Sequence, residues 1–105
     1  FELGAHVAPT GIAFYNGSMF PSEMKNNLFI ALHGSWNRSK KVGYKVIRVA
    51  LDEDGNVISS NDFISGWLQN EKVLGRPSAP FVLKDGSILI SDDKANLIYR
   101  VVHKM

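Results

Sequence analysis

The feature that most constrains the fold is an internal repeat of short apolar segments separated by glycine turns. Residues 28–31 in the first half of the chain align with residues 88–91 in the second half. In the same order, residues 46–49 align with residues 98–101. A repeat of about 50 to 70 residues built from short antiparallel strands is typical of β-propeller blades. The repeat therefore predicts an all-β chain of two consecutive antiparallel blades.

Segments of strand length, rich in β-branched and aromatic residues, fill the chain between its glycine and proline turns. In the first half they predict strands at residues 10–15, 28–33, 44–51 and within 57–68, the last centred on Phe63 and Ile64. In the second half they predict strands at residues 79–83, 87–91 and 97–103. Residues 21–26 favour a short helix, because Pro21 and Ser22 can start a helical turn.

These strands divide a single β domain of residues 1–105 into two unequal blades. Blade one covers about residues 8–68 with four strands, and blade two covers about residues 76–105 with three. A blade without its fourth strand exposes a sheet edge that must be covered. Two blades cannot close a ring, since rings contain roughly four to eight. We therefore expect the remaining blades either in a parent chain, which the start at Phe1 favours, or in further copies of this chain.

Charge and residue types narrow the classes of function. The 12 basic residues are interleaved with 10 acidic ones, giving a formal net charge of +2, and no block of like charge favours nucleic acid or a membrane surface. The densest basic stretch, residues 38–48, is expected to be solvated. The chain has no cysteine, which excludes disulfides and thiolate chemistry. No apolar run approaches the roughly 20 residues of a membrane span.

The order of the strands predicts which polar residues share one end of the sheets. In an antiparallel blade, alternate connections emerge at the same end. This rule gathers at one end His6, residues 33–38, Arg76, Asp92 and Asp93. The opposite end receives ordinary hairpin turns at residues 16–17, 52–55 and 84–86. A ligand site is therefore expected at the first end.

Residues 33–38 form the densest chemical group, because they follow a buried strand with an imidazole, a hydroxyl, an indole, a carboxamide and a guanidinium. Such a loop can hold a planar, polyanionic ligand. Trp36 can stack on a ring, Asn37 can hydrogen-bond a carbonyl and Arg38 can pair with a carboxylate. The alternative is that Trp36 caps the core, His33 satisfies a backbone group and Arg38 is solvated. The residues alone leave both interpretations open.

Arg76 is a second candidate for an anion contact. It lies between Gly75 and Pro77, a stiff turn that fixes the direction of its side chain. The alternative is a salt bridge at the rim with Glu71 or Asp92.

Neither a metal site nor a catalytic group is predicted. Asp92 and Asp93 are adjacent, and adjacent side chains on a strand point to opposite faces. A hydrolytic triad of Ser35, His33 and Asp92 is disfavoured, because a serine and a histidine two residues apart do not meet in an activated arrangement.

Several runs of sequence resemble the C-terminal part of the glucose/sorbosone dehydrogenase family. The most specific run is His33-Gly34-Ser35-Trp36-Asn37-Arg38-Ser39. The others are Leu3-Gly4-Ala5-His6-Val7-Ala8-Pro9, Val42-Gly43-Tyr44-Lys45-Val46, Gly75-Arg76-Pro77, Asp85-Gly86 and Ser91-Asp92-Asp93. That family consists of six-bladed propellers that oxidise aldoses or related sugars with pyrroloquinoline quinone (PQQ), calcium ions and a histidine base.

The resemblance implies roles for individual residues at the shared end. It places Trp36, Asn37, Arg38 and Arg76 at the cofactor, and His6, His33 and Asp92 at the substrate rim. It supplies no catalytic or calcium-binding residue in this chain, because the family's histidine base and main calcium ligands lie in upstream blades.

The resulting hypothesis is a C-terminal fragment of a PQQ-dependent sugar dehydrogenase, inactive alone. The full-length family oxidises sugar aldehyde or hemiacetal groups, and the resemblance implies a periplasmic location and a small-molecule sugar as partner. The alternative is a small binding or assembly module in which three copies complete a propeller. A third reading, a propeller hydrolase of the lactonase type, requires more metal carboxylates than Asp92 and Asp93 provide.

Overall fold

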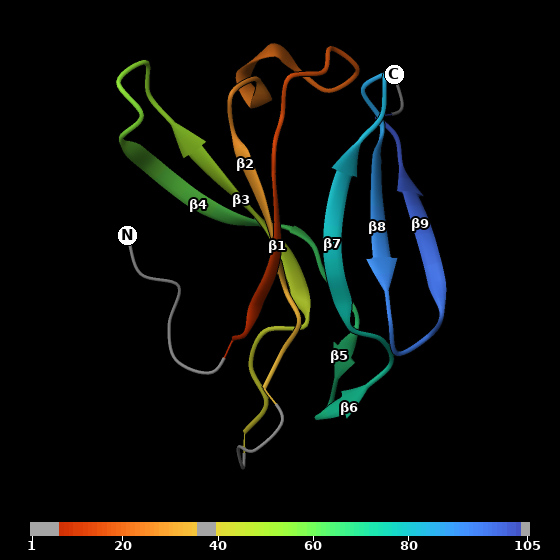
Figure 1. Cartoon of the computed structure of the whole chain (residues 1–105). Coiled ribbons are helices and arrows are strands. Elements are labelled where there is room, and N and C mark those ends of the chain that lie inside the picture. The colour runs from red at the N-terminus through yellow and green to blue at the C-terminus, as the bar shows by residue number, and fades with distance from the viewer. Residues whose placement is uncertain (1–6, 36–39, 104–105) are drawn as a thin grey trace.

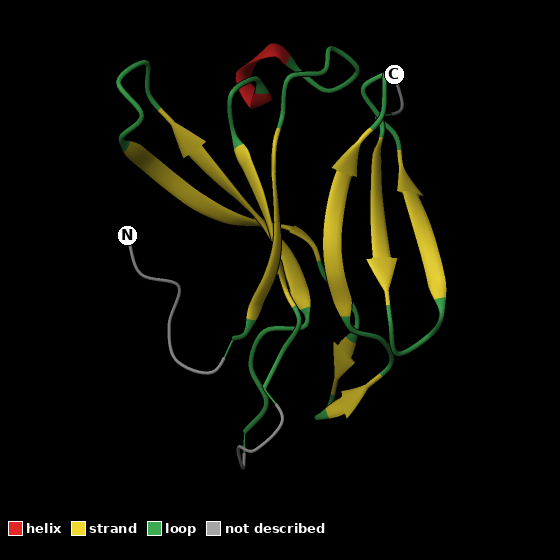
Figure 2. Cartoon of the chain, viewed as in Figure 1, coloured by secondary structure: helices red, strands yellow, loops and turns green. Residues whose placement is uncertain are grey.

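The computed structural model describes residues 7–35 and 40–103, which are almost entirely β-structure (Figure 1). One 3-10 helical turn, η1 (Ser22–Met24), interrupts the strands, as Figure 2 shows. The strands are β1 (Pro9–Phe14), β2 (Leu28–Leu32), β3 (Lys45–Leu51), β4 (Val57–Ile64), β5 (Leu68–Gln69), β6 (Lys72–Val73), β7 (Pro77–Val82), β8 (Ile88–Asp92) and β9 (Leu97–Val101). Within this part of the chain, no helix is long and apolar enough to cross a membrane.

The first sheet is a four-stranded antiparallel blade with the order β1-β2-β3-β4. Its second strand, β2, is an unbroken apolar run that is buried over most of its length, because apolar layers form on both faces of the sheet. The outer strand β4 is largely exposed, and its middle residues, 59–62, are polar. The predicted first blade of four strands is therefore confirmed.

The second sheet, β7-β8-β9, repeats the pairing of the first. Ala31 pairs with Val46 in the first sheet, and the residues aligned with them, Ser91 and Ile98, pair in the second. Both inner strands, β1 and β7, also carry a register shift close to their first residue. The repeat seen in the sequence is thus a structural repeat, and the predicted all-β fold of antiparallel sheets is confirmed.

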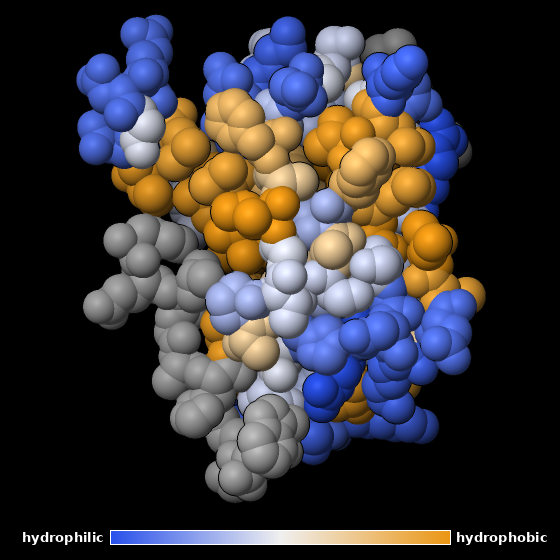
Figure 3. All heavy atoms as spheres, in the orientation of Figure 1, coloured by the Kyte–Doolittle hydropathy of each residue, from blue (hydrophilic) through white to orange (hydrophobic). Residues whose placement is uncertain are grey.

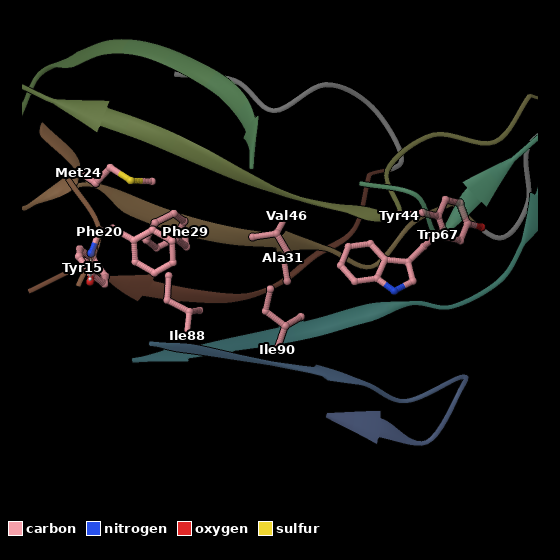
Figure 4. Close-up of a cluster of buried hydrophobic side chains, with 10 residues drawn as sticks. All are labelled: Tyr15, Phe20, Met24, Phe29, Ala31, Tyr44, Val46, Trp67, Ile88 and Ile90. Carbon is pink, nitrogen blue, oxygen red and sulfur yellow. Dashed lines mark hydrogen bonds between the residues drawn. The ribbon is translucent and has the colours of Figure 1, made fainter. Parts of the chain in front are cut away.

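The main hydrophobic core lies between the two sheets (Figure 4). Phe29, Ala31 and Val46 of the first sheet face Ile88 and Ile90 of the second. Aromatic and methionine side chains extend this core toward both ends of the sheets: Tyr15, Phe20, Met24, Tyr44 and Trp67. Burying each large apolar side chain contributes about 1.5–3 kcal/mol. The two blades therefore form one packed unit.

A second apolar cluster covers the opposite face of the first sheet. It contains Val7, Ile30, Leu32, Ile47 and Val49, and it points away from the second sheet. Figure 3 shows apolar side chains gathered over the upper parts of β1 and β7, as viewed there. Each blade thus has one face packed against the other blade and one face that no described sheet covers.

Tyr15 joins the two sheets at the end that holds the hairpin turns. Its buried hydroxyl donates a hydrogen bond to the carbonyl of Gly86 at 2.7 Å and accepts one from the N–H of Phe20 at 3.3 Å. The side chain therefore fixes the first loop of one blade against the first turn of the other.

The structure corrects some boundaries that the sequence predicted. The fourth strand ends at Ile64, so Phe63 lies at its end and not at its centre. The helix expected over residues 21–26 is a single turn, η1, because three residues follow Pro21 before the chain turns into an extended conformation at Lys25. The other predicted strands begin and end within two residues of the observed ones.

The β5–β6 hairpin between the blades was not predicted from the sequence. Two-residue strands are too short to show the alternation that identifies a strand. Asn70 and Glu71 form its turn, with φ angles of 51° and 63°. Positive φ at both central residues is typical of tight hairpin turns and usually uses Asn or Gly.

Candidate functional site

The polar residues predicted to share one end of the sheets divide into two groups. His6, Trp36, Asn37 and Arg38 lie outside the described residues. His33, Arg76 and Asp92 are described, and all three lie at the end of the sheets where β2 finishes and β7 begins (Figure 1).

His33 and Asp93 connect the two blades at this end. His33 follows β2, Asp93 follows β8, and Nε2 of the imidazole lies 2.7 Å from Oδ1 of the carboxylate. At that distance the imidazole N–H donates to the carboxylate. His33 therefore bonds to a side chain of the other blade, and not to the backbone group that the alternative interpretation expected.

Arg76 contacts the loop that follows β2. Its Nη2 donates to the backbone carbonyl of Ser35 at 3.3 Å and to the hydroxyl of Tyr44 at 3.2 Å. Its guanidinium carbon lies 5.3 Å from the centre of the Tyr44 ring, within the range of a cation–π contact. Among the described residues no carboxylate forms a salt bridge with this guanidinium. Arg76 therefore supplies positive charge in a fixed position at this end.

Tyr44 supports both Arg76 and the loop that precedes residues 36–39. Its buried hydroxyl donates to the Ser35 carbonyl. Gly34 has a φ of 109°, and a Cβ there would lie 2.5 Å from the Tyr44 ring, so glycine is required for this close approach. The aromatic ring and the glycine together fix where the loop leaves the sheet.

Asp92 is the buried anchor of the second blade, with 2% of its surface exposed. Oδ1 accepts hydrogen bonds from the N–H groups of Arg76, Lys94 and Ala95 at 2.9, 3.1 and 2.9 Å. Oδ2 accepts one from the hydroxyl of Tyr99 at 2.7 Å. Burial opposes ionisation, but the hydrogen bonds from Ala95, Arg76, Tyr99 and Lys94 outweigh it and hold the pKa of Asp92 below its usual value.

Trp67 completes this group from the segment between the blades. Its Nε1 donates to the Tyr99 hydroxyl at 3.2 Å, and the two rings pack edge to face. The hydrogen bond that Tyr99 donates to Asp92 is the largest cause of the raised pKa of Tyr99. Tyr44, Trp67 and Tyr99 were not predicted from the sequence, although the alternation of β9 places Tyr99, which pairs with Ile90, on the face toward the first blade.

The geometry does not support hydrolytic or metal chemistry among the described residues. The Oγ of Ser35 accepts a hydrogen bond from the N–H of Val42 at 3.1 Å, and His33 pairs with Asp93, so Ser35, His33 and Asp92 form no triad. In the described part of the chain, no group of three or more His, Asp or Glu side chains can hold a metal ion. Asp92 already accepts four hydrogen bonds from the protein.

The described residues fit an anionic, planar ligand better. Nη2 of Arg76 donates to the Ser35 carbonyl and to the Tyr44 hydroxyl. The other N–H groups of this guanidinium can donate to a carboxylate of a ligand. PQQ is a planar quinone with carboxylates, so Arg76 fits one edge of it. The residues predicted to complete that edge, Trp36, Asn37 and Arg38, directly follow Ser35 in the sequence.

Two antiparallel blades with their polar residues at one end define a segment of a β-propeller. Comparison with known families is more specific: the model of the TrAA12-like family matches residues 1–101. The chain belongs to the TrAA12-like family. A relative of uncharacterised function in Borreliella burgdorferi is 48% identical over 99% of the chain. The chain spans 28% of the length of that relative.

Part of the chain is similar to a relative with a named activity. A pyrroloquinoline quinone-dependent pyranose dehydrogenase of Coprinopsis cinerea is 45% identical over 45% of the chain, a match that covers 6% of that protein. The PQQ domain of a Coprinopsis cinerea pyranose dehydrogenase, solved in its holo form, superposes with a TM-score of 0.73 at 25% identity, over 93% of this chain and 27% of that one.

A calcium structure of a Trichoderma reesei protein of carbohydrate-active enzyme family AA12 shows the same fold. It has a TM-score of 0.73 at 23% identity and covers 91% of this chain and 24% of that one. The likeness to PQQ-dependent sugar dehydrogenases expected from the sequence is therefore confirmed. The narrower assignment to the glucose/sorbosone family stays a prediction.

Proposed function

We propose that the chain forms one rim of a PQQ site in a sugar-oxidising propeller and is inactive without further blades. The observation that carries the proposal is the position of Arg76. Its guanidinium is held by Ser35 and Tyr44 where the two blades meet, with no carboxylate paired to it among the described residues.

Each residue at the rim has a distinct task in this proposal. Arg76 and Arg38 contact carboxylates of the cofactor, Asn37 donates to a carbonyl, and Trp36 packs on the ring system. When bound, PQQ supplies a quinone that accepts two electrons and two protons as a sugar hemiacetal or aldehyde is oxidised. The similarity to the Coprinopsis pyranose dehydrogenase, whose name includes PQQ, supports this choice of cofactor.

The substrate rim is proposed to contain His33 and His6, with Asp92 in a supporting position. Asp92 is buried and bonds to the backbone N–H of Arg76, so it acts on a ligand through Arg76. His33 is held by Asp93 and is partly exposed, which allows its ring to contact a sugar hydroxyl.

The wider assignments follow from the family resemblance. We propose one domain over residues 1–105, with blades at about 8–68 and 76–105, inside a six-bladed ring. The general base and the calcium ligands are assigned to other blades, and the assembled protein is placed in the periplasm. The proposed partners are a small sugar and the remaining blades.

Titration with PQQ tests the rim directly. Wild type is expected to bind PQQ with quenching of tryptophan fluorescence, and Arg76→Lys is expected to weaken binding about tenfold or more, because lysine cannot form a bidentate contact. Arg100→Lys is the matched control. Arg100 pairs with Asp85 near the opposite end of the second sheet, so its replacement is expected to leave the affinity unchanged. Equal affinities of wild type and Arg76→Lys for PQQ would refute the proposed contact between Arg76 and the cofactor.

An activity assay tests the second half of the proposal. With PQQ, calcium, glucose and an artificial electron acceptor, the chain is expected to show no enzymatic turnover. Turnover at an enzymatic rate would show that the two blades contain the catalytic residues after all.

A further inference from the structure

Asn16 and Gly17 form the only asparagine–glycine pair in the chain. Asparagine is a thermolabile residue, and a following glycine has no Cβ to obstruct the approach of its backbone nitrogen to the asparagine side chain. Asn16 is exposed and lies in the loop that connects β1 with β2, at the end of the sheets opposite the candidate site (Figure 1). The pair is therefore separate from the residues that the proposed function uses.

The backbone around this pair is not held in a tight turn. The sequence predicted an ordinary hairpin turn at residues 16–17, but the structure has a longer loop, which Tyr15 closes by donating its N–H to the Asn27 carbonyl at 2.8 Å. In the described part of the chain, the N–H of Gly17 donates to no acceptor. No hydrogen bond therefore keeps the Gly17 nitrogen away from the side chain of Asn16.

Two aspartate–glycine pairs, Asp54-Gly55 and Asp85-Gly86, provide an internal comparison. Each glycine donates its N–H within a turn, to the Asp52 carbonyl at 3.1 Å and to the Leu83 carbonyl at 3.0 Å. Their φ angles are 84° and 89°, which are typical of glycine in a tight turn. A carboxylate is also a poorer target for attack than an amide, because it carries a negative charge. The fold therefore protects both of these pairs but not the asparagine–glycine pair.

We propose that Asn16 is a site of spontaneous modification, at which the side-chain amide deamidates and both aspartate and isoaspartate form. The Gly17 nitrogen gives its proton to hydroxide and attacks Cγ of Asn16. A bond forms between these atoms, the Cγ–Nδ2 bond breaks, and Nδ2 takes a proton from water and leaves as ammonia. Water then opens the cyclic imide, at the side-chain carbonyl to give aspartate or at the main-chain carbonyl to give isoaspartate. Water is consumed and ammonia is released, with no oxidant or cofactor.

The position of Asn16 gives isoaspartate a structural effect. Isoaspartate lengthens the backbone before Gly17 by a carbon atom. The backbone has no space to move there, because a Cβ on Gly17 would lie 2.7 Å from the Gly86 Cα and 2.7 Å from the Tyr15 hydroxyl. That hydroxyl donates to the Gly86 carbonyl at 2.7 Å and connects the two sheets. Isoaspartate is therefore expected to weaken the contact between the sheets, whereas aspartate keeps the length of the backbone and leaves it intact.

Incubation at neutral and alkaline pH, followed by peptide mass spectrometry, tests the site. The peptide that contains residue 16 is expected to gain the mass difference between an amide and an acid, and an isoaspartyl methyltransferase is expected to label it. Both signals are expected to rise faster at alkaline pH, because the Gly17 nitrogen must lose its proton. Asn16→Gln is expected to abolish both, since the longer side chain closes a ring less readily. Asn56→Gln is the matched control, because Asn56 is exposed but precedes the branched residue Val57.

Incubation in urea separates the effect of the fold from that of the sequence. Unfolding releases the N–H groups of Gly55 and Gly86 from their turns, so isoaspartate is expected at Asp54 and Asp85 in urea and not in the folded chain. At Asn16 it is expected to form in both states. The absence of a mass gain at residue 16 of the folded chain would overturn the proposal. So would isoaspartate that appears first at Asp54 or Asp85, or a rate in Asn16→Gln equal to that of wild type.

Urea unfolding of the modified chain tests the structural effect. The isoaspartyl form, separated by chromatography, is expected to unfold at a lower urea concentration than fresh wild type. Asn16→Asp is expected to unfold at the same urea concentration as wild type, because its backbone is unchanged. Equal midpoints for the isoaspartyl form and Asn16→Asp would overturn the proposed effect on the contact between the sheets.

Discussion

The first and second sheets share one pattern of strand pairing but differ in what surrounds them. Phe29 and Leu89 occupy equivalent positions, yet Phe29 is buried and Leu89 is only partly covered, because Phe29 faces the other sheet and Leu89 faces no sheet in the described part of the chain. The repeated sequence therefore determines how the strands of a blade pair. How deeply a side chain of that blade is buried depends on whether another blade packs against it.

The two sheets also differ at the end that holds the candidate site. Leu32 pairs with Pro9 in the first sheet, and Asp92 pairs with Pro77 at the equivalent place in the second. Both side chains are buried, but Leu32 joins an apolar cluster whereas Asp92 organises the backbone around Arg76. At the end that holds the candidate site, the second blade thus has a buried carboxylate, Asp92, where the first blade has an apolar core residue, Leu32.

The largest predicted effect separates the equivalent positions Phe29 and Leu89. Phe29→Ala removes a ring whose centre lies 4.5 Å from the centre of the Phe63 ring. This change is expected to lower the free energy of unfolding by about 3–5 kcal/mol. Leu89→Ala is expected to cost about 1 kcal/mol, because less of its surface is buried. Urea unfolding at a concentration where the chain is monomeric measures both, and equal losses would contradict the comparison.

The second prediction concerns Asp92. Asp92→Asn removes the charged acceptor of three backbone N–H groups and is expected to cost about 1–3 kcal/mol at neutral pH. Asp93→Asn, at the neighbouring exposed carboxylate, is expected to cost less than about 1 kcal/mol. Chemical unfolding of both variants measures the difference.

The same carboxylate predicts a dependence of stability on pH. The pKa of Asp92 is lowered in the folded chain from its ordinary value of 3.8, so the unfolded chain binds the proton more tightly. Its contribution is complete well above pH 3.8 and is lost as the pH falls through the lower, folded pKa. Asp92→Asn is therefore expected to flatten the acid side of the stability curve. An unchanged slope would show that Asp92 does not carry this dependence.

The next prediction compares two buried tyrosine hydroxyls at opposite ends of the sheets. Tyr44→Phe and Tyr15→Phe each remove a hydrogen bond to a backbone carbonyl, and each is expected to cost about 1 kcal/mol. Only Tyr44→Phe is expected to weaken PQQ binding as well, because its hydroxyl also accepts from Arg76. Equal affinities for PQQ in the two variants would contradict a positioning role for Tyr44.

The smallest effect is expected at the turn of the second sheet. Hydrogen bonds from the side chain and backbone of Ser87, with smaller contributions from Arg100, lower the pKa of Asp85 from 3.8 to about 2. Ser87→Ala removes the larger of these bonds, so the pKa is expected to rise toward 3.8. Carboxyl NMR titration measures it. A smaller rise is expected in Arg100→Lys, because the contribution of Arg100 is smaller.

The blades could be predicted from the sequence for two reasons. Most of their strands are long enough to show an apolar pattern, and the same order of strands occurs twice. Residues 28–31 align with residues 88–91, and their partner strands align as well, so both sheets show the same pairing. The rule that alternate loops share an end also placed His33, Arg76 and Asp92 together.

The contacts between side chains at the end that holds the candidate site could not be predicted from the sequence. The ring of Tyr44 packs on Arg76 across 32 positions of the chain, and Trp67 bonds to Tyr99 over the same separation. No local pattern signals such pairs, since each depends on how the second blade is oriented on the first. For the same reason, Asp92 was predicted at a substrate rim and is found buried beneath Arg76.

Amide NMR spectra recorded during addition of PQQ test the cofactor rim, because they compare the two ends of the sheets in one experiment. Shifts are expected at His33, Ser35, Arg76 and Lys94, and none at Gly17 or Gly86 in the opposite turns. Shifts confined to the opposite end, or none at saturating PQQ, would contradict a cofactor rim built around Arg76.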